Sequence, residues 1–98
     1  MQVRFQAAGG EEVAAHTKNI GVGGAFIVTP TPPKIGTHLR LMIEMPNTGS
    51  TLEVRAEIRW LSNSPDVGMG VRFAGLDVDQ LLALNEYFAS LTATVDHD

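Results

Sequence analysis

Hydrophobic and polar residues alternate along several short segments of the chain, and this two-residue period predicts β-strands. The clearest case is residues 51–61, where one side of the predicted strand is apolar and consists of Leu52, Val54, Ala56, Ile58 and Trp60. We expect this whole series, Trp60 included, to face the core. Residues 38–45 repeat the pattern, and the loop 46–50 between the two segments is rich in turn-forming residues. Together they predict a β-hairpin.

Four further segments show strand patterns: residues 2–7, 12–18, 25–29 and 67–74. In the last of them Met69, Val71 and Phe73 are expected to face inward, which places Gly68 and Gly70 on the opposite face. Residues 29–33 hold three prolines and must form a non-helical connector, because proline fixes φ and lacks an N–H donor.

After residue 74 the period changes to that of a helix. Asp77 and Gln80 are spaced as a capping box, with Asp77 as N-cap. A broad apolar stripe follows at helical spacing: Val78, Leu81, Leu82, Leu84, Phe88 and Leu91. We expect a helix over about 78–91 that covers a barrel opening or contacts a partner. Six strands and one helix predict a mainly β fold, a small six-stranded antiparallel β-barrel over about 2–74 with a C-terminal α-helix.

Length and composition are typical of one globular domain covering residues 1–98, with 44% hydrophobic residues and a mean hydropathy of +0.06. No run approaches the roughly 20 apolar residues that a membrane helix needs, so we expect no membrane insertion. The chain has no cysteine, which excludes disulfides and thiolate chemistry. Its start lacks the pattern of a secretory signal. We therefore expect a cytoplasmic protein.

The net charge of −4 is unevenly distributed. Residues 1–60 hold six Lys and Arg against five Asp and Glu, whereas residues 61–98 hold one against six. Nucleic-acid binding requires a concentrated basic face, and the sequence reveals none. We expect no nucleic-acid partner; a nucleic-acid-binding barrel is the alternative from another functional class, and salt-dependent binding to an oligonucleotide would support it.

Residues 19–24 form a glycine-rich turn that precedes the apolar run 25–29. Asn19 stands at its entrance, and Gly21, Gly23 and Gly24 permit tight or left-handed backbone geometry. Such a turn can bring the backbone close to a flat or phosphorylated ligand, or it can simply connect two strands. The residues alone leave both interpretations open.

The order of these elements resembles that of a PilZ domain. Residues 19–24 are similar to the family motif Asp/Asn-x-Ser-x-x-Gly, and residues 58–60 (Ile-Arg-Trp) and 68–73 (Gly-Met-Gly-Val-Arg-Phe) also resemble family features. The resemblance implies a six-stranded barrel with a C-terminal helix that receives the bacterial second messenger cyclic di-GMP. It assigns the ligand contacts to Asn19, Gly21, Gly23 and Gly24.

Two departures from the family pattern imply a degenerate ligand site. The family places Ser where this chain has Gly21, and it places Arg-x-x-x-Arg before the first strand, where only Arg4 is near. A literal Arg-x-x-x-Arg does occur at Arg55 and Arg59, but four strand residues span roughly 13 Å. We interpret these two as part of a solvated ladder of alternating charges with Glu53 and Glu57. Cyclic di-GMP binding is therefore expected to be weak or absent.

No residue set pairs a nucleophile with a base, so we expect no enzyme and no catalytic residues. His16, His38 and His97 match no metal-binding spacing, so we expect no metal. Asp77 and Asp79 are accounted for by the start of the helix.

The leading hypothesis is thus an adaptor that contacts another bacterial signalling or motility protein, with a homodimer as an alternative. The candidate interface is the lateral extension of the helix stripe, Leu84, Tyr87 and Leu91, joined by Leu61 or Met42. The second hypothesis is a working cyclic di-GMP receptor whose arginines come from upstream residues or from a partner.

Overall fold

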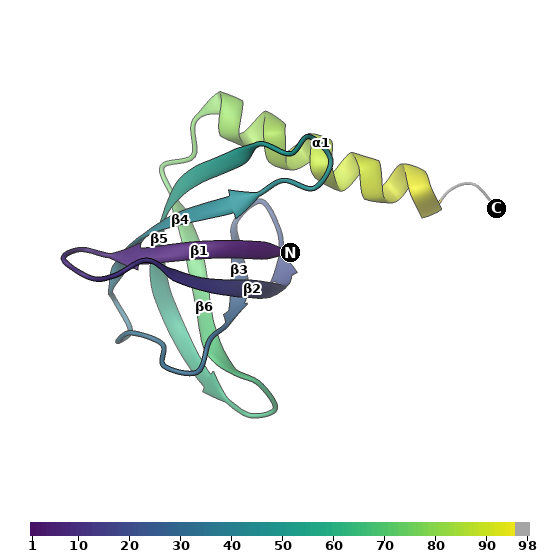
Figure 1. Cartoon of the computed structure of the whole chain (residues 1–98). Helices are drawn as coiled ribbons and strands as arrows, with labels where there is room; N and C mark the ends of the chain where they lie inside the picture. The colour runs from purple at the N-terminus through teal and green to yellow at the C-terminus, as the bar shows by residue number, and fades with distance from the viewer. Residues whose placement is uncertain (96–98) are drawn as a thin grey trace.

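The chain folds into a closed β-barrel with one helix at its C-terminal end (Figure 1). A computed structural model describes the backbone of residues 1–95 and the side chains of residues 1–90. The strands and the helix have the following bounds: β1 (Gln2–Ala7), β2 (Val13–Ile20), β3 (Gly24–Val28), β4 (His38–Glu44), β5 (Thr51–Asn63), β6 (Val67–Ala74) and α1 (Val78–Val95).

All neighbouring strands are antiparallel, and their order around the barrel is β1-β2-β3-β6-β5-β4. β3 and β4 follow each other in the chain but are not neighbours, because β3 pairs with β6 and β4 pairs with β1 and β5. The proline-containing connector lies between them and is not helical, as predicted. The predicted fold class, a six-stranded antiparallel barrel with a C-terminal helix, is confirmed.

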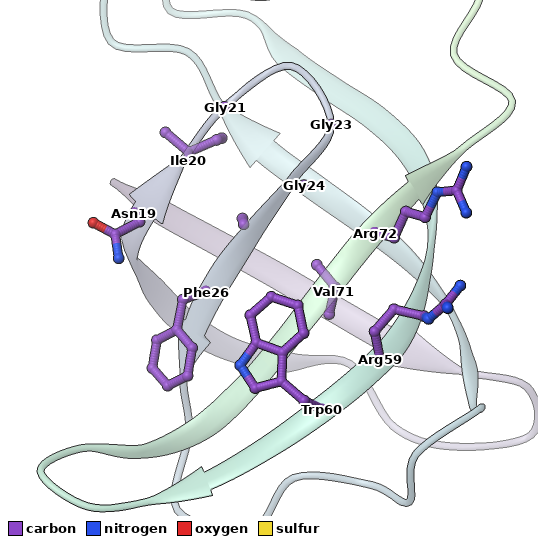
Figure 2. A pocket seen from close by; sticks show the side chains of 11 residues that line it. Asn19, Ile20, Gly21, Gly23, Gly24, Phe26, Arg59, Trp60, Val71 and Arg72 are labelled. Carbon is purple, nitrogen blue, oxygen red and sulfur yellow. The ribbon is translucent and has the colours of Figure 1, made fainter.

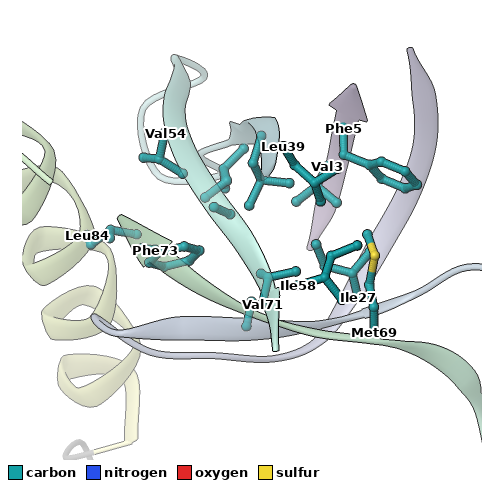
Figure 3. Packing of buried hydrophobic residues seen from close by; sticks show 14 of the residues in the cluster. Val3, Phe5, Ile27, Leu39, Val54, Ile58, Met69, Val71, Phe73 and Leu84 are labelled. Atoms are coloured by element: carbon teal, nitrogen blue, oxygen red, sulfur yellow. The ribbon is translucent and has the colours of Figure 1, made fainter. Parts of the chain in front are cut away.

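The inward faces of the strands form one hydrophobic core (Figure 3). Val54, Ala56 and Ile58 are at most 2% exposed, as their alternation in β5 predicted. Met42 was predicted to lie at an outward strand position and be available to a partner; the predicted availability is wrong, since only 5% of it is exposed although it does not belong to the core cluster. Its partners on the adjoining strands are Arg4 and Glu53, and the aliphatic parts of such long side chains cover apolar neighbours.

The capping box forms as predicted and starts α1. The backbone N–H of Gln80 donates to Oδ1 of Asp77 at 2.8 Å, and the backbone N–H of Asp77 donates to Oε1 of Gln80 at 3.0 Å. The side-chain amide of Gln80 also donates to the carbonyl oxygen of Glu53 in β5. The first helical turn is therefore hydrogen-bonded both to itself and to the barrel.

The helix closes the barrel core through Leu84, which is fully buried. This corrects the prediction that Leu84 is available as an interface residue. Tyr87 is half-buried and packs against the same core. The side chain of Leu91 and the whole of His97 lie outside the described residues. Along residues 1–95, the structure contains no helix long and apolar enough to cross a membrane.

Trp60 does not belong to the core, contrary to the prediction. The pairing of β5 with β6 shifts register between Ile58 and Trp60, and a one-residue shift moves the following side chains to the other face of a strand. Trp60 consequently lies on the outer face with 51% of its surface exposed.

Gly70 leaves the space that the indole of Trp60 occupies on the outer face. Gly70 is paired with Phe26 on β3 and with Trp60 on β5, so these residues form one row across three strands. A Cβ atom on Gly70 would lie 1.9 Å from the indole ring, and one on Gly68 would lie 2.9 Å from the ring of Phe26. The two glycines of β6 thus allow both rings to approach its backbone.

Replacing Leu84 by Ala should test how α1 is held. We expect Leu84→Ala to lower the free energy of unfolding by about 2–5 kcal/mol, because it opens a cavity in the core. Leu82→Ala on the same helix is the matched control, since Leu82 is 57% exposed and its loss should cost within about 0.5 kcal/mol. Urea denaturation measures both, and equal costs would contradict the described packing.

Gly70→Ala should displace the indole of Trp60. Trp60 is the sole tryptophan, so its fluorescence reports the ring directly, and we expect a shifted emission maximum in a folded protein. Gly21→Ala is the control, because no atom lies within 4 Å of a Cβ there. An unchanged emission maximum in Gly70→Ala would show that the ring does not lie over this glycine.

Candidate ligand-binding site

An open depression of about 880 Å³ lies on the outer face of β2, β3, β6 and β5, beside the β2–β3 turn (Figure 2). The four residues that the sequence predicted as ligand contacts all line it, namely Asn19, Gly21, Gly23 and Gly24. The other lining residues are Ile20, Ala25, Phe26, Arg59, Trp60, Val71 and Arg72. The turn thus forms one wall of a larger surface hollow.

Hydrogen bonds hold the β2–β3 turn against β6. The N–H of Gly21 donates to the carbonyl oxygen of Gly24 at 2.9 Å, and the N–H of Phe73 donates to the carbonyl oxygen of Gly23 at 2.9 Å. A Cβ on Gly24 would lie 2.2 Å from the carbonyl oxygen of Val71. Glycine is required at position 24 because the two backbones approach closely.

The left-handed geometry that the glycines permit is not used. None of Gly21, Gly23 and Gly24 has a positive φ. Open space surrounds the positions that a Cβ would take at Gly21 and Gly23. The missing side chains at these two positions therefore leave the depression wider, and a serine would fit at position 21 without a clash.

Two arginines that the sequence analysis did not assign to the site lie at its edge. Arg59 from β5 and Arg72 from β6 both line the depression (Figure 2). Nη1 of Arg59 lies 3.6 Å from Oε1 of Glu57, a long and exposed ion pair. The side chain of Arg72 makes no hydrogen bond or ion pair with any other residue of the described part of the chain. Both guanidinium groups are therefore available to an anionic ligand.

The arginine nearest the chain start is not part of this site. Nη1 of Arg4 on β1 lies 2.9 Å from Oε1 of Glu12, and Arg4 does not line the depression. Arg55, the other half of the literal Arg-x-x-x-Arg, does not line it either. Arg59 belongs to the Ile-Arg-Trp segment that resembles a family feature, but only the order of the strands places it in the same depression as the glycine turn.

The groups in the depression are suited to binding a planar, anionic molecule. The exposed indole of Trp60 presents an apolar face to a flat ring, the guanidinium groups match phosphate oxygens, and the amide of Asn19 offers both donors and an acceptor. Within residues 1–95, no group of three or more His, Asp or Glu residues gathers as a metal site requires. His16 and His38 stand on separate strands, β2 and β4.

The comparison with protein families matches the PilZ domain over residues 1–90. Among solved structures, the Bacillus subtilis inhibitor of motility MotI/DgrA is similar with a TM-score of 0.81 and 23% identity, over 95% of this chain and 46% of that one. Escherichia coli YcgR, solved in complex with c-di-GMP, is similar with a TM-score of 0.77 and 14% identity, over 96% and 42%. This chain therefore spans less than half the length of both proteins.

A third similar structure is close to this chain in length. The PilZ domain of CeSA from a cellulose-synthesizing bacterium aligns with a TM-score of 0.70 and 18% identity, over 94% of this chain and 92% of that one. No curated protein sequence matches this chain significantly. These structural likenesses share the barrel and its closing helix. Since the family match covers nearly the whole chain, this chain belongs to the PilZ domain family.

Proposed function

We propose that this PilZ domain is a non-enzymatic module of bacterial cyclic di-GMP signalling that acts in the cytoplasm by contacting another protein. We also propose that its own dinucleotide site is degenerate. One observation carries the second point: the depression is present, but Gly21 supplies no hydroxyl group and Arg4 on β1 is paired with Glu12 outside the depression.

The cost of these departures is large on the scale of ligand binding. A hydrogen bond to a charged group contributes about 1.5–3 kcal/mol. A domain without the two arginines and the hydroxyl would therefore lose several kcal/mol, or roughly three decades of affinity at 1.4 kcal/mol per decade. Arg59 and Arg72 compensate only in part, because both project from strands on one side of the depression.

The protein-contact role is supported by exposed apolar residues and by the neighbouring structures. Val78 and Leu82 on α1 are 71% and 57% exposed, and Leu61 on β5 is 44% exposed. Exposed apolar groups of this kind mark contact surfaces when they gather. With Leu84 buried, Tyr87 and Leu91 remain the predicted interface residues. The structurally similar MotI is by its name an inhibitor of motility, which makes a motility protein the first partner to test.

A second candidate function, a complete cyclic di-GMP receptor, is favoured by the position of Met1. The carbonyl oxygen of Met1 accepts a hydrogen bond from the N–H of Thr17 on β2 at 2.8 Å. Because β1 and β2 are antiparallel, any residues before Met1 that continued this pairing would run toward Asn19. Because Asn19 lines the depression, arginines in such a segment would lie near it; a partner or a second copy is the alternative source of arginines.

Titration calorimetry with cyclic di-GMP tests the degenerate site directly. We expect no saturable binding to the 98-residue chain at low micromolar ligand, because the cationic groups that hold both phosphates are missing. Binding in that range would contradict a degenerate site and favour the receptor. An oligonucleotide titrated at low ionic strength is the control for nonspecific attraction of a polyanion.

Restoring the family pattern should restore binding. An Arg-x-x-x-Arg leader before Gln2 together with Gly21→Ser should create measurable cyclic di-GMP binding, whereas Gly21→Ser alone should change little. The serine fits because the space at Gly21 is open. A leader with Gln in place of both arginines is the matched control. If the folded double variant does not bind, the depression is not the dinucleotide site.

A further inference from the structure

A second hollow, of about 790 Å³, lies on the outer face of β1, β4, β5 and β6. It is lined by Gln6, Ala7, Ala8, Gly9, His38, Leu39, Arg40, Glu53, Arg55 and Ala74. It shares no residue with the depression beside the glycine turn.

The strand register places two arginines directly opposite each other in this hollow. Gln6 on β1 pairs with Arg40 on β4, Arg40 pairs with Arg55 on β5, and Arg55 pairs with Ala74 on β6. Directly opposite residues of an antiparallel pair extend from the same face, and like charges placed so are destabilising. Both arginines are exposed. The sequence analysis interpreted Arg55 as part of a solvated charge ladder along β5, and that interpretation does not explain why Arg55 lies opposite another arginine on β4.

Glu53 is the one residue that forms an ion pair with Arg40 or Arg55 among the residues whose side chains are described. Asp77 lines an adjoining hollow together with Arg55 and Glu53 but forms no ion pair with either arginine. Nη2 of Arg40 donates to Oε1 of Gln6 at 3.0 Å, and Nε of Arg40 lies 3.6 Å from Oε2 of Glu53. The side chain of Arg55 forms no hydrogen bond or ion pair with any residue of that same part of the chain. Glu57, the next outward acid along β5, is paired with Arg59 instead. The two guanidinium groups thus carry more positive charge than Glu53 neutralises.

Small residues leave the space beside this pair open. Ala74 is the neighbour of Arg55 on β6, and Ala7, Ala8 and Gly9 border the hollow from β1 and the following turn. Gly9 has φ +75°, and no atom lies within 4 Å of the position that a Cβ would take there, so the turn does not fill the hollow. Planar guanidinium groups bind carboxylate and phosphate oxygens in pairs of parallel hydrogen bonds.

We propose that Arg40 and Arg55 form a second, oxyanion-binding site that takes the carboxylate or phosphate groups of an acidic ligand. Gln6 orients Arg40, Ala74 provides room, and the ligand supplies the negative charge that the pair lacks. This site is independent of the proposed function, because it uses none of the residues of the first depression. In this proposal Arg55 binds an oxyanion in the second hollow and does not act as half of an Arg-x-x-x-Arg motif for cyclic di-GMP.

An NMR titration of the whole chain at low ionic strength tests this site. The probes are inorganic pyrophosphate and the peptide acetyl-Glu-Glu-amide, which distinguish a phosphate from a carboxylate source. We expect at least one probe to shift the backbone amides of Arg40, Arg55 and Ala74. Failure of both probes to shift these amides would overturn the proposal.

Matched variants locate the binding. Arg55→Gln should lower the affinity for the probe that shifts the amides about tenfold or more, since a hydrogen bond to a charged group is lost. Arg4→Gln is the control for the general loss of a charge on the barrel surface, and Arg72→Gln is the control for the first depression; both should stay within about twofold. An unchanged affinity in Arg55→Gln, or an equal loss in either control, would overturn the proposal.

Thermal melting gives an independent readout. The responding probe should raise Tm of the parent chain more than Tm of Arg55→Gln at the same concentration, because weaker binding stabilises the folded state less. An equal rise in both proteins would overturn the proposal. Arg55→Gln should fold, since its side chain is exposed and makes no polar contact within the described residues.

Discussion

The register shift between Ile58 and Trp60 is the feature on which the outer surface of this barrel depends. Up to Ile58, β5 alternates regularly and contributes Val54, Ala56 and Ile58 to the core. After the shift, the indole of Trp60 lies outside, over Gly70. Without the shift, the largest side chain of β5 would enter a core that is already filled, and overpacking a core is itself destabilising. The depression would also lose its exposed aromatic ring.

The same strand divides the exposed cations into two groups. Arg59 and Arg72 line the depression that the glycine turn borders, whereas Arg55 lies opposite Arg40 in the second hollow. Glu57 is paired with the first group and Glu53 with the second. A chain with a net charge of −4 thus places two pairs of exposed arginines on one barrel. This distribution is suited to small anionic groups rather than to a long polyanion, which requires a continuous basic face.

Membership of the PilZ family explains the architecture and does not decide the ligand. The similar structures share 14–23% identity with this chain, and similarity at that level reflects the barrel and the closing helix. What this barrel binds depends on a few side chains at its surface. A hydroxyl at position 21 and two arginines would change the affinity by decades, and the hydroxyl would leave the core unchanged, because no atom lies within 4 Å of a Cβ at Gly21.

The sequence by itself determined the elements whose causes are local. Alternation in β4, β5 and β6 predicted their inward faces, and the spacing of Asp77 and Gln80 predicted where α1 begins. Strand alternation and capping hydrogen bonds involve residues close together in the chain, so their pattern can be read directly.

Only the tertiary structure decided which residues meet on the barrel surface and which are covered. The exposure of Trp60, the burial of Met42 and Leu84, and the two arginine groups all depend on contacts between residues far apart in sequence. A single shift of register reverses the face of every residue that follows it. Strand order sets which side chains become neighbours. No local sequence pattern encodes the register shift or the strand order.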